Sequence, residues 1–163
     1  MKYSTRLDTT SRIITSLLIG VCLVLLTVSV FTGREGAVAS IVPALILVVI
    51  VTVTWSVKPL AYELTADALI IIRPLSRKRV LLADIAEVFP LAADELKGSI
   101  RSFGSGGLFG YLGYFASQQQ GAYEMWCTDR TSMVMIILKN KKKLVISPVE
   151  RNEFVLALQQ VIQ

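Results

Sequence analysis

The chain has no histidine and only two cysteines among its 163 residues. The absence of histidine removes the commonest general base and the commonest metal ligand of proteins, and it excludes Ser–His and Cys–His pairs. Cys22 and Cys127 form no CxxC spacing and no disulfide framework. The sequence therefore predicts a protein that is not an enzyme, with no catalytic residues, no metal site and no cofactor.

Charge is also missing from two long stretches near the start of the chain. No charged residue occurs between Arg12 and Arg34, and none between Glu35 and Lys58. Each stretch has about the 20 apolar residues that a helix needs to cross the hydrocarbon core of a bilayer. We expect residues 1–58 to form a transmembrane helical hairpin, with helices at about 13–33 and 37–57 and an outer turn at residues 33–36.

A cleaved signal peptide is the alternative interpretation of the first stretch. Ala37-Val38-Ala39 has the small-residue pattern of a cleavage site. However, the apolar stretch is too long for the core of a signal peptide, and Arg34 and Glu35 interrupt the approach to that site. An uncleaved hairpin fits the pattern better.

Basic residues flank the two stretches on the same side. Lys2, Arg6 and Arg12 precede the first, Lys58 and later bases follow the second, and the turn has one Arg and one Glu. Loops rich in Lys and Arg stay in the cytoplasm. We therefore expect a cell-membrane protein that crosses the bilayer twice, with both termini cytoplasmic.

Residues 59–163 have the size of one small domain. They carry twelve Lys and Arg against ten Asp and Glu, so no nucleic-acid partner is predicted. β-Branched runs separated by turn residues predict an antiparallel sheet, closed or nearly closed. The expected strands are residues 61–65, 68–73, 78–82, 122–128, 131–139 and 143–146, with 83–88 either extended or a helical turn.

The chain is predicted to end in a helix that covers one side of this sheet. Ser147, Pro148 and Glu150 have the order of an N-cap, a first helical position and a capping-box acid. Apolar residues then recur with a helical period up to Val161.

Residues 98–121 are rich in glycine and aromatic residues. This glycine density argues against a stable helix or an ordinary strand interior. Exposed aromatic side chains mark contact sites, so we expect an interface with another copy, a partner membrane protein or the membrane face; the alternative is a lid over the domain itself. The candidate interface residues are Phe103, Phe109, Tyr111, Tyr114 and Phe115. No G-K-[ST] follows the glycines, so a nucleotide site is not expected.

Two basic turns are candidates for contact with anionic lipid. A base near such a surface contributes about 1 kcal/mol of attraction. The alternative is that these bases only keep strand edges soluble. The residues are Arg73, Arg77, Lys78 and Arg79 in the first turn, and Lys141, Lys142 and Lys143 in the second.

Four sequence blocks resemble the bacterial membrane proteins that carry a pleckstrin-homology (PH) domain. They are Tyr62-x-Leu64-x-x-Asp67-x-Leu69-Ile70-Ile71, Leu82-x-Asp84-Ile85-x-x-Val88, Arg101-x-Phe103-Gly104-x-Gly106-Gly107-x-Phe109-Gly110-x-x-Gly113, and Ile146-Ser147-Pro148 with Phe154. The resemblance implies an α+β protein in which a transmembrane helical hairpin precedes a PH-like antiparallel β-barrel or sandwich with a C-terminal capping helix.

The resemblance also bears on function. PH domains that bind phosphoinositides carry bases in the first hairpin, whereas residues 65–68 have an acid and no base, so that ligand is not expected. We expect a non-catalytic membrane-anchored interaction module on the cytoplasmic face that binds a protein partner or anionic membrane lipids. The alternative is a self-assembling or regulatory subunit of a membrane complex that uses residues 98–115.

Overall fold

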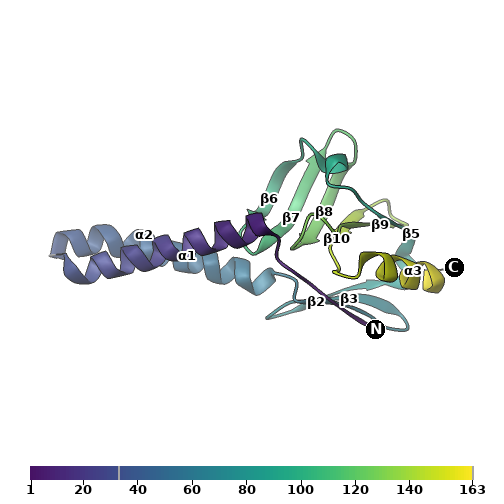
Figure 1. Cartoon of the computed structure of the whole chain (residues 1–163), viewed down its shortest axis with the longest axis horizontal. Coiled ribbons are helices and arrows are strands. Elements are labelled where there is room, and N and C mark those ends of the chain that lie inside the picture. Colours follow the sequence, from purple (N-terminus) through teal and green to yellow (C-terminus); the bar gives the residue numbers. More distant parts are fainter. Residues whose placement is uncertain (33, 163) are drawn as a thin grey trace.

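Two long antiparallel helices project from a β-rich domain in the computed structural model, which describes residues 1–32 and 34–162 (Figure 1). Helix α1 spans Thr9–Phe31 and helix α2 spans Arg34–Val57. The Asp8 carboxylate caps α1 by accepting a hydrogen bond from the N–H of Ser11 at 2.7 Å. Both helices begin three or four residues earlier than predicted, and Gly33 of the predicted turn lies outside the described residues.

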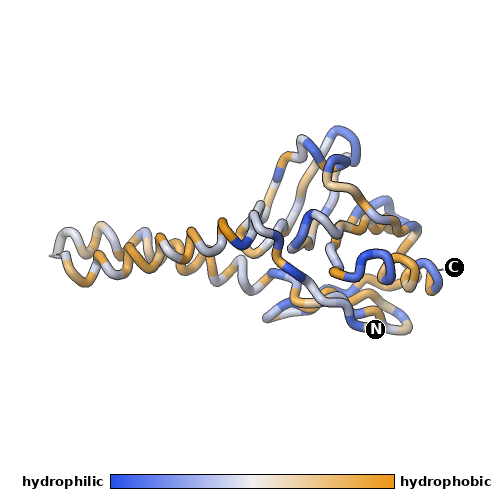
Figure 2. Tube along the Cα trace, in the orientation of Figure 1, coloured by the Kyte–Doolittle hydropathy of each residue, from blue (hydrophilic) through white to orange (hydrophobic). Residues whose placement is uncertain are grey.

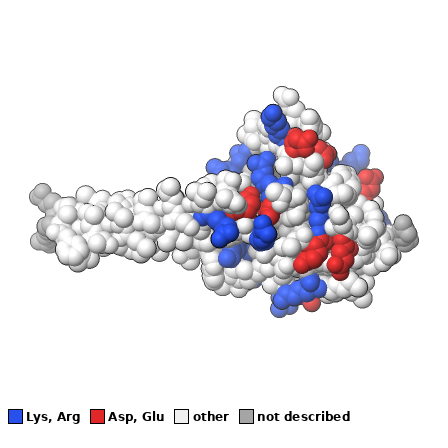
Figure 3. All heavy atoms as spheres, viewed as in Figure 1, with Lys and Arg blue, Asp and Glu red and all other residues white. Residues whose placement is uncertain are grey.

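Neither helix has a charged side: no charged residue follows Arg12 in α1 or Glu35 in α2. Figure 2 shows apolar and weakly polar residues along the hairpin, and Figure 3 shows Lys, Arg, Asp and Glu beginning where the domain begins. Each helix is long and apolar enough to cross a membrane, and only 11% of each apolar window is buried in the protein. A helix that is apolar on all sides is typical of a membrane span or of the core of a large protein. Ala44 is buried between the helices, where its carbonyl accepts a weak hydrogen bond from Cys22 Sγ at 3.8 Å.

The domain consists of two sheets, named here sheet A and sheet B. Sheet A is antiparallel, in the order β1-β2-β3-β4: Lys2–Ser4, Ala61–Leu64, Ala68–Ile72 and Arg77–Leu81. Sheet B has the order β5-β9-β10-β8-β7-β6, and its strands are, in chain order, β5 Ile85–Pro90, β6 Ile100–Gly107, β7 Gly110–Ser117, β8 Gly121–Cys127, β9 Val134–Leu138 and β10 Lys143–Ile146. Short 3₁₀ turns lie at Leu82–Asp84 (η1) and Asp94–Leu96 (η2), and helix α3 spans Arg151–Ile162.

The predicted fold class is confirmed as a sandwich rather than a closed barrel. Two apolar helices precede all the strands except β1, and α3 packs against β5 of sheet B. β8 and β10 pair in parallel, so sheet B is mixed where an antiparallel sheet was predicted. The predicted strands of sheet A agree with β2, β3 and β4 to within one residue.

Strand β1 was not predicted, because its three residues show no strand pattern of their own. The amine of Met1 donates to the Leu64 carbonyl at 2.6 Å, and the N–H of Leu64 donates to the Met1 carbonyl at 2.7 Å. Tyr3 is buried edge-on against Phe154 at 5.0 Å between ring centroids. The segments before α1 and after α2 therefore lie side by side in one sheet, at the same end of the helical hairpin (Figure 1).

A buried tyrosine connects the two sheets. The Tyr62 hydroxyl of β2 donates to the Trp126 carbonyl of β8 at 2.6 Å and accepts from the N–H of Ser147 at 3.1 Å. The side chain is fully buried, and this burial raises the pKa of the phenol above its ordinary range. The hydroxyl thus stays protonated and connects β2 of sheet A to β8 and to the end of β10 of sheet B.

The predicted capping box at the last helix is wrong. α3 begins at Arg151, and the Glu150 carbonyl accepts the hydrogen bond from the N–H of Phe154 at 2.9 Å. The Ser147 hydroxyl instead accepts from the N–H groups of Thr128 and Asp129 at 2.9 and 3.2 Å. Ser147 is fully buried at the end of β10, so its tertiary partners replaced the local capping contact.

The expectation that the glycine-rich segment cannot form ordinary strands is also wrong. It forms the β6–β7 hairpin, with Gly104 directly opposite Gly113. Both glycines have a positive φ, of 119° and 114°. A Cβ on Gly104 would lie 1.9 Å from the Leu112 carbonyl oxygen, and one on Gly113 would lie 2.2 Å from the Phe103 oxygen. Glycine is needed here because the two backbones approach too closely for any side chain.

Candidate binding surfaces

The β6–β7 hairpin has two faces with different chemistry, because successive side chains of a strand point to opposite sides. Cross-strand register places Arg101 beside Phe115, and Phe115 beside Tyr123 of β8. On the other face, Phe103 lies beside Tyr114. The five aromatic residues predicted as one interface are therefore divided between two faces and a tip.

The tip of the hairpin rests on the base of the helical hairpin. The N–H of Phe109 donates to Thr15 Oγ1 of α1 at 3.0 Å, and the Lys58 ammonium lies 5.3 Å from the centre of the Phe109 ring. Phe109 is 8% exposed, and so is Phe115, which stacks on Tyr123 with ring centroids 6.0 Å apart. Phe109 and Phe115 are thus packed within the chain.

The outer face of the hairpin is exposed and apolar. Ile100, Phe103 and Tyr114 are 74%, 75% and 56% exposed. A groove of about 430 Å³ separates this face from the end of α2. Its apolar lining residues are Val53 and Val57 of α2 together with Phe103, Leu112, Tyr114 and Trp126. This surface lies directly beside the end of a helix that is long enough to cross a membrane.

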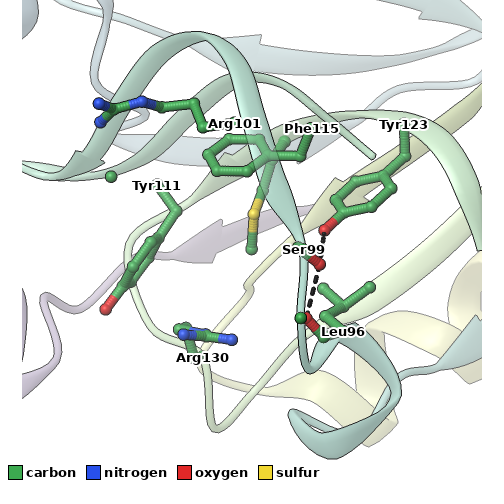
Figure 4. Close-up of a pocket in the computed structure, with 10 residues that line it drawn as sticks. Leu96, Ser99, Arg101, Tyr111, Phe115, Tyr123 and Arg130 are labelled. Atoms are coloured by element: carbon green, nitrogen blue, oxygen red, sulfur yellow. Dashed lines mark hydrogen bonds between the residues drawn. The ribbon is translucent and has the colours of Figure 1, made fainter. Parts of the chain in front are cut away.

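The inner face of the hairpin lines a separate pocket of about 300 Å³, drawn in Figure 4. Arg101 and Arg130 stand on two sides of it, with Tyr111 and Phe115 between them. The Tyr123 hydroxyl donates to Ser99 Oγ at 2.6 Å, and that hydroxyl donates to the Leu96 carbonyl at 2.5 Å. Burial raises the pKa of Tyr123, so its hydroxyl is neutral at physiological pH.

Most bases of the first turn have partners within the chain. Lys78 forms an ion pair with Glu124, and Arg79 forms one with Asp67. The Arg73 guanidinium lies 4.7 Å from the centre of the Trp126 ring. Arg77 is exposed. The turn lies near α2, because β3 ends at Ile72, whose carbonyl accepts from the N–H of Leu60 at 2.8 Å.

The second basic turn lies far from α1 and α2. Lys143 Nζ donates to the carbonyl of Gln120, in the β7–β8 turn, at 2.7 Å. That turn is at the opposite end of β7 from the tip that contacts α1, about 20 Å away by strand length. Lys141 and Lys142 are exposed there.

Sequence reasoning missed the inner pocket. Arg101 was noticed only as part of a family-like block, and Arg130, in the β8–β9 connection, was not singled out. Their proximity depends on the register of β6, β7 and β8, which a glycine-rich sequence without a regular alternation does not specify. Within residues 1–32 and 34–162, no group of three or more His, Cys, Asp or Glu side chains is arranged to hold a metal ion.

Comparison with known proteins agrees with this architecture. The model of the bacterial PH domain family matches residues 60–162, which comprise sheet B, α3 and all of sheet A except β1. No curated protein and no solved structure is found to be significantly similar to the chain. PH domains are in general non-enzymatic interaction modules. Because the match covers more than half of the chain, the protein belongs to the bacterial PH domain family.

Proposed function

We propose that this protein is a non-catalytic interaction module that holds a protein partner beside the membrane. The observation that carries the proposal is the exposed apolar surface made by Ile100 and Phe103 on the edge strand β6 and by Tyr114 on the neighbouring strand β7. β6 is the last strand of sheet B, so one side of its backbone has no neighbouring strand among the described residues. Such an edge is a template for pairing with another chain.

The position of this surface points to a partner anchored in the same membrane. The groove next to Phe103 is walled by Val53 and Val57 at the end of α2. A partner that fills it must lie against the last turns of that helix, where a second membrane protein is held at high local concentration. In contrast, three of the four bases in the first turn are engaged by Glu124, Asp67 or Trp126, which lessens their capacity for lipid headgroups.

The proposal includes an anchor and an orientation. The helical hairpin within residues 1–58 crosses the membrane, and residues 59–163 form the PH-like domain, to whose sheet A the N-terminal strand β1 is added. We expect both ends in the cytoplasm, because Lys and Arg are more frequent in the segments that flank the hairpin than in its turn. A cysteine introduced by Gly33→Cys, with Cys22 and Cys127 replaced by serine, is expected to react with a membrane-impermeant thiol reagent from outside. Lys142→Cys is expected to react only after the membrane is opened, and the reverse pattern contradicts this orientation.

Photo-crosslinking in the native membrane tests the partner. A photoreactive amino acid at Phe103 is expected to capture a protein, whereas one at Leu156, which is 61% exposed on α3, is the matched control. A product of twice the chain's mass identifies a second copy, and another discrete mass identifies a different protein. Capture of lipid alone, or equal capture from both positions, contradicts the proposal.

Substitution separates contact from folding. Phe103→Ser with Tyr114→Ser is expected to abolish the crosslinked complex and to leave the melting temperature within a few degrees, because surface changes rarely exceed about 0.5 kcal/mol. Phe109→Ser is the contrasting variant and is expected to destabilise the protein, because Phe109 is packed against α1. An intact complex in the double variant would show that the partner binds elsewhere.

A further inference from the structure

The inner pocket is lined by cations and aromatic rings but by no acid. Its lining residues are Leu96, Gly98, Ser99, Arg101, Gly106, Tyr111, Phe115, Tyr123, Met125 and Arg130. At about 300 Å³, the pocket lies at the lower end of the range for small-molecule sites. It faces away from the surface proposed above for a partner, because it lies on the opposite side of the β6–β7 hairpin.

Neither arginine is neutralised within the described part of the chain. The two ion pairs found there involve Lys78 and Arg79, and no side-chain hydrogen bond of Arg101 or Arg130 is present. Nε of Arg130 is buried without a hydrogen-bond partner, which is costly for a charged group. The Arg130 guanidinium lies 5.2 Å from the centre of the Tyr111 ring, so it is held at the pocket wall.

Asp8, Asp94 and Asp129 line a hollow that adjoins the pocket at Arg130, and none of the three forms an ion pair with Arg130. The Asp129 carboxylate accepts from the N–H and the hydroxyl of Thr131 at 2.8 and 2.6 Å. The Asp8 carboxylate caps α1 through Ser11. These acids line an adjoining hollow on the other side of Arg130, outside the pocket itself.

Gly106 gives Arg101 room to reach the pocket. A Cβ at position 106 would lie 3.0 Å from Nη1 of Arg101, closer than an ordinary contact. Any side chain there would push the guanidinium away. Gly106 therefore differs in role from Gly104 and Gly113. It leaves space for the Arg101 guanidinium, whereas Gly104 and Gly113 allow the backbones of β6 and β7 to approach closely.

We propose that this pocket binds a small anion that carries a flat ring, namely an aromatic carboxylate or phosphate. Arg101 and Arg130 donate charge-assisted hydrogen bonds to the anionic group. The flat ring lies against Phe115, Tyr123 and Met125, where stacking and burial favour it. Both parts of the ligand are required, because the polar rim and the apolar floor belong to one cavity.

Ligand titration of the full chain in neutral phosphatidylcholine nanodiscs tests the proposal. Phenyl phosphate is the probe, and saturation-transfer NMR of its ring protons reports binding. Inorganic phosphate supplies the charge alone and phenol supplies the ring alone, and the affinity of each is measured as its ability to displace phenyl phosphate. Phenyl phosphate is expected to bind saturably, to bind at least about tenfold more tightly than either control, and to weaken as salt rises. Equal binding of phenol or of phosphate overturns the proposed ligand class, and so does the absence of saturable binding of phenyl phosphate in the millimolar range.

Three variants locate the site. Arg101→Gln and Arg130→Gln are each expected to weaken phenyl phosphate binding about tenfold or more, as loss of a charged donor does. Gly106→Ala is expected to weaken it in the same direction without removing any charge. Arg77→Gln, on sheet A, is the matched control and leaves binding unchanged. If Arg130→Gln does not fold, Arg101→Gln and Gly106→Ala test the site without it. If both of these variants keep the melting temperature and bind phenyl phosphate with unchanged affinity, the proposed site is wrong.

Discussion

The two halves of sheet B differ in almost every property. Strands β5, β9 and β10 form one end of sheet B and pack, together with α3, around the hydrophobic core. β9 consists of Val134-Met135-Ile136-Ile137-Leu138, and its first three residues are fully buried. The outer strand β6 has glycine at three of its eight positions and exposes most of its side chains. One half is built from aliphatic residues, and the other from glycine, aromatic residues and arginine.

This difference separates stability from recognition. Strands β5, β9 and β10 stabilise the folded state by burying aliphatic surface, which contributes about 25 cal/mol per Å² to the free energy of unfolding. The outer hairpin buries less, yet it presents an apolar face on one side and a cationic pocket on the other. Binding surfaces often lie in such less stable regions of a protein. Side chains that are fully packed within the chain are not available to contact a partner.

The largest expected effect comes from the same substitution in the two halves. Ile136→Ala in β9 removes a fully buried side chain and is expected to lower the free energy of unfolding by about 2–5 kcal/mol. Ile100→Ala in β6 removes a side chain that is 74% exposed, and a change within about 0.5 kcal/mol is expected. Thermal and denaturant unfolding of the two variants measure both values. If the two variants lose similar free energies of unfolding, then β6 contributes to stability as β9 does, and the proposed separation of stability from recognition is wrong.

A smaller effect is expected from the close approach within the outer hairpin. Gly104→Ala forces a side chain into a positive-φ position that costs about 1–3 kcal/mol, and the contact with the Leu112 carbonyl adds to this. Gly106→Ala, two residues away, meets only the flexible end of Arg101 and is expected to leave stability almost unchanged. Hydrogen exchange of β6 and β7 amides distinguishes local loosening of the hairpin from global unfolding. Equal protection in both variants would contradict the role of Gly104.

The smallest effect is a dependence of stability on alkaline pH. Burial raises the pKa of the Cys127 thiol, at the end of β8, above its ordinary value, so the folded protein keeps a proton that the unfolded chain releases above about pH 8.5. The unfolded state then binds fewer protons, and stability falls by about 1 kcal/mol per pH unit. Unfolding measured between pH 7 and 10 is expected to show this decline, and Cys127→Ala is expected to reduce it. If the free energy of unfolding does not change between pH 7 and 10, burial does not raise the pKa of the Cys127 thiol in the folded protein.

Much of the fold could be predicted from local patterns. The uncharged stretches predicted α1 and α2, and β-branched runs predicted β2, β3, β4 and β10, because each element satisfies its own periodicity. The start of the last helix was predicted wrongly, because the order Ser-Pro-x-Glu fits a helix N-cap. The Ser147 hydroxyl instead accepts a hydrogen bond from the N–H of Thr128, directly after β8. Local sequence cannot reveal a partner on another strand.

The candidate surfaces were less predictable for the same reason. The sequence identified the aromatic residues of the hairpin, and only the strand register separates Phe103 and Tyr114 from Phe115 and Tyr111. The basic turns have equivalent compositions, yet one lies near α2 and the other beside Gln120. Composition therefore located the segments of interest, whereas the side of the molecule that each residue faces depended on tertiary pairing.

The pairing of β1 with β2 has a consequence for how the chain assembles. The two strands are separated in sequence by both helices, so sheet A is completed only by closing a loop of more than 50 residues. A disordered loop of that length carries an entropic cost that grows with its logarithm. Pairing of α1 with α2 brings Ser4 and Ala61 together in advance and removes most of this cost. We therefore expect formation of the helical hairpin to favour completion of sheet A, and a fragment that begins after α2 would lack strand β1.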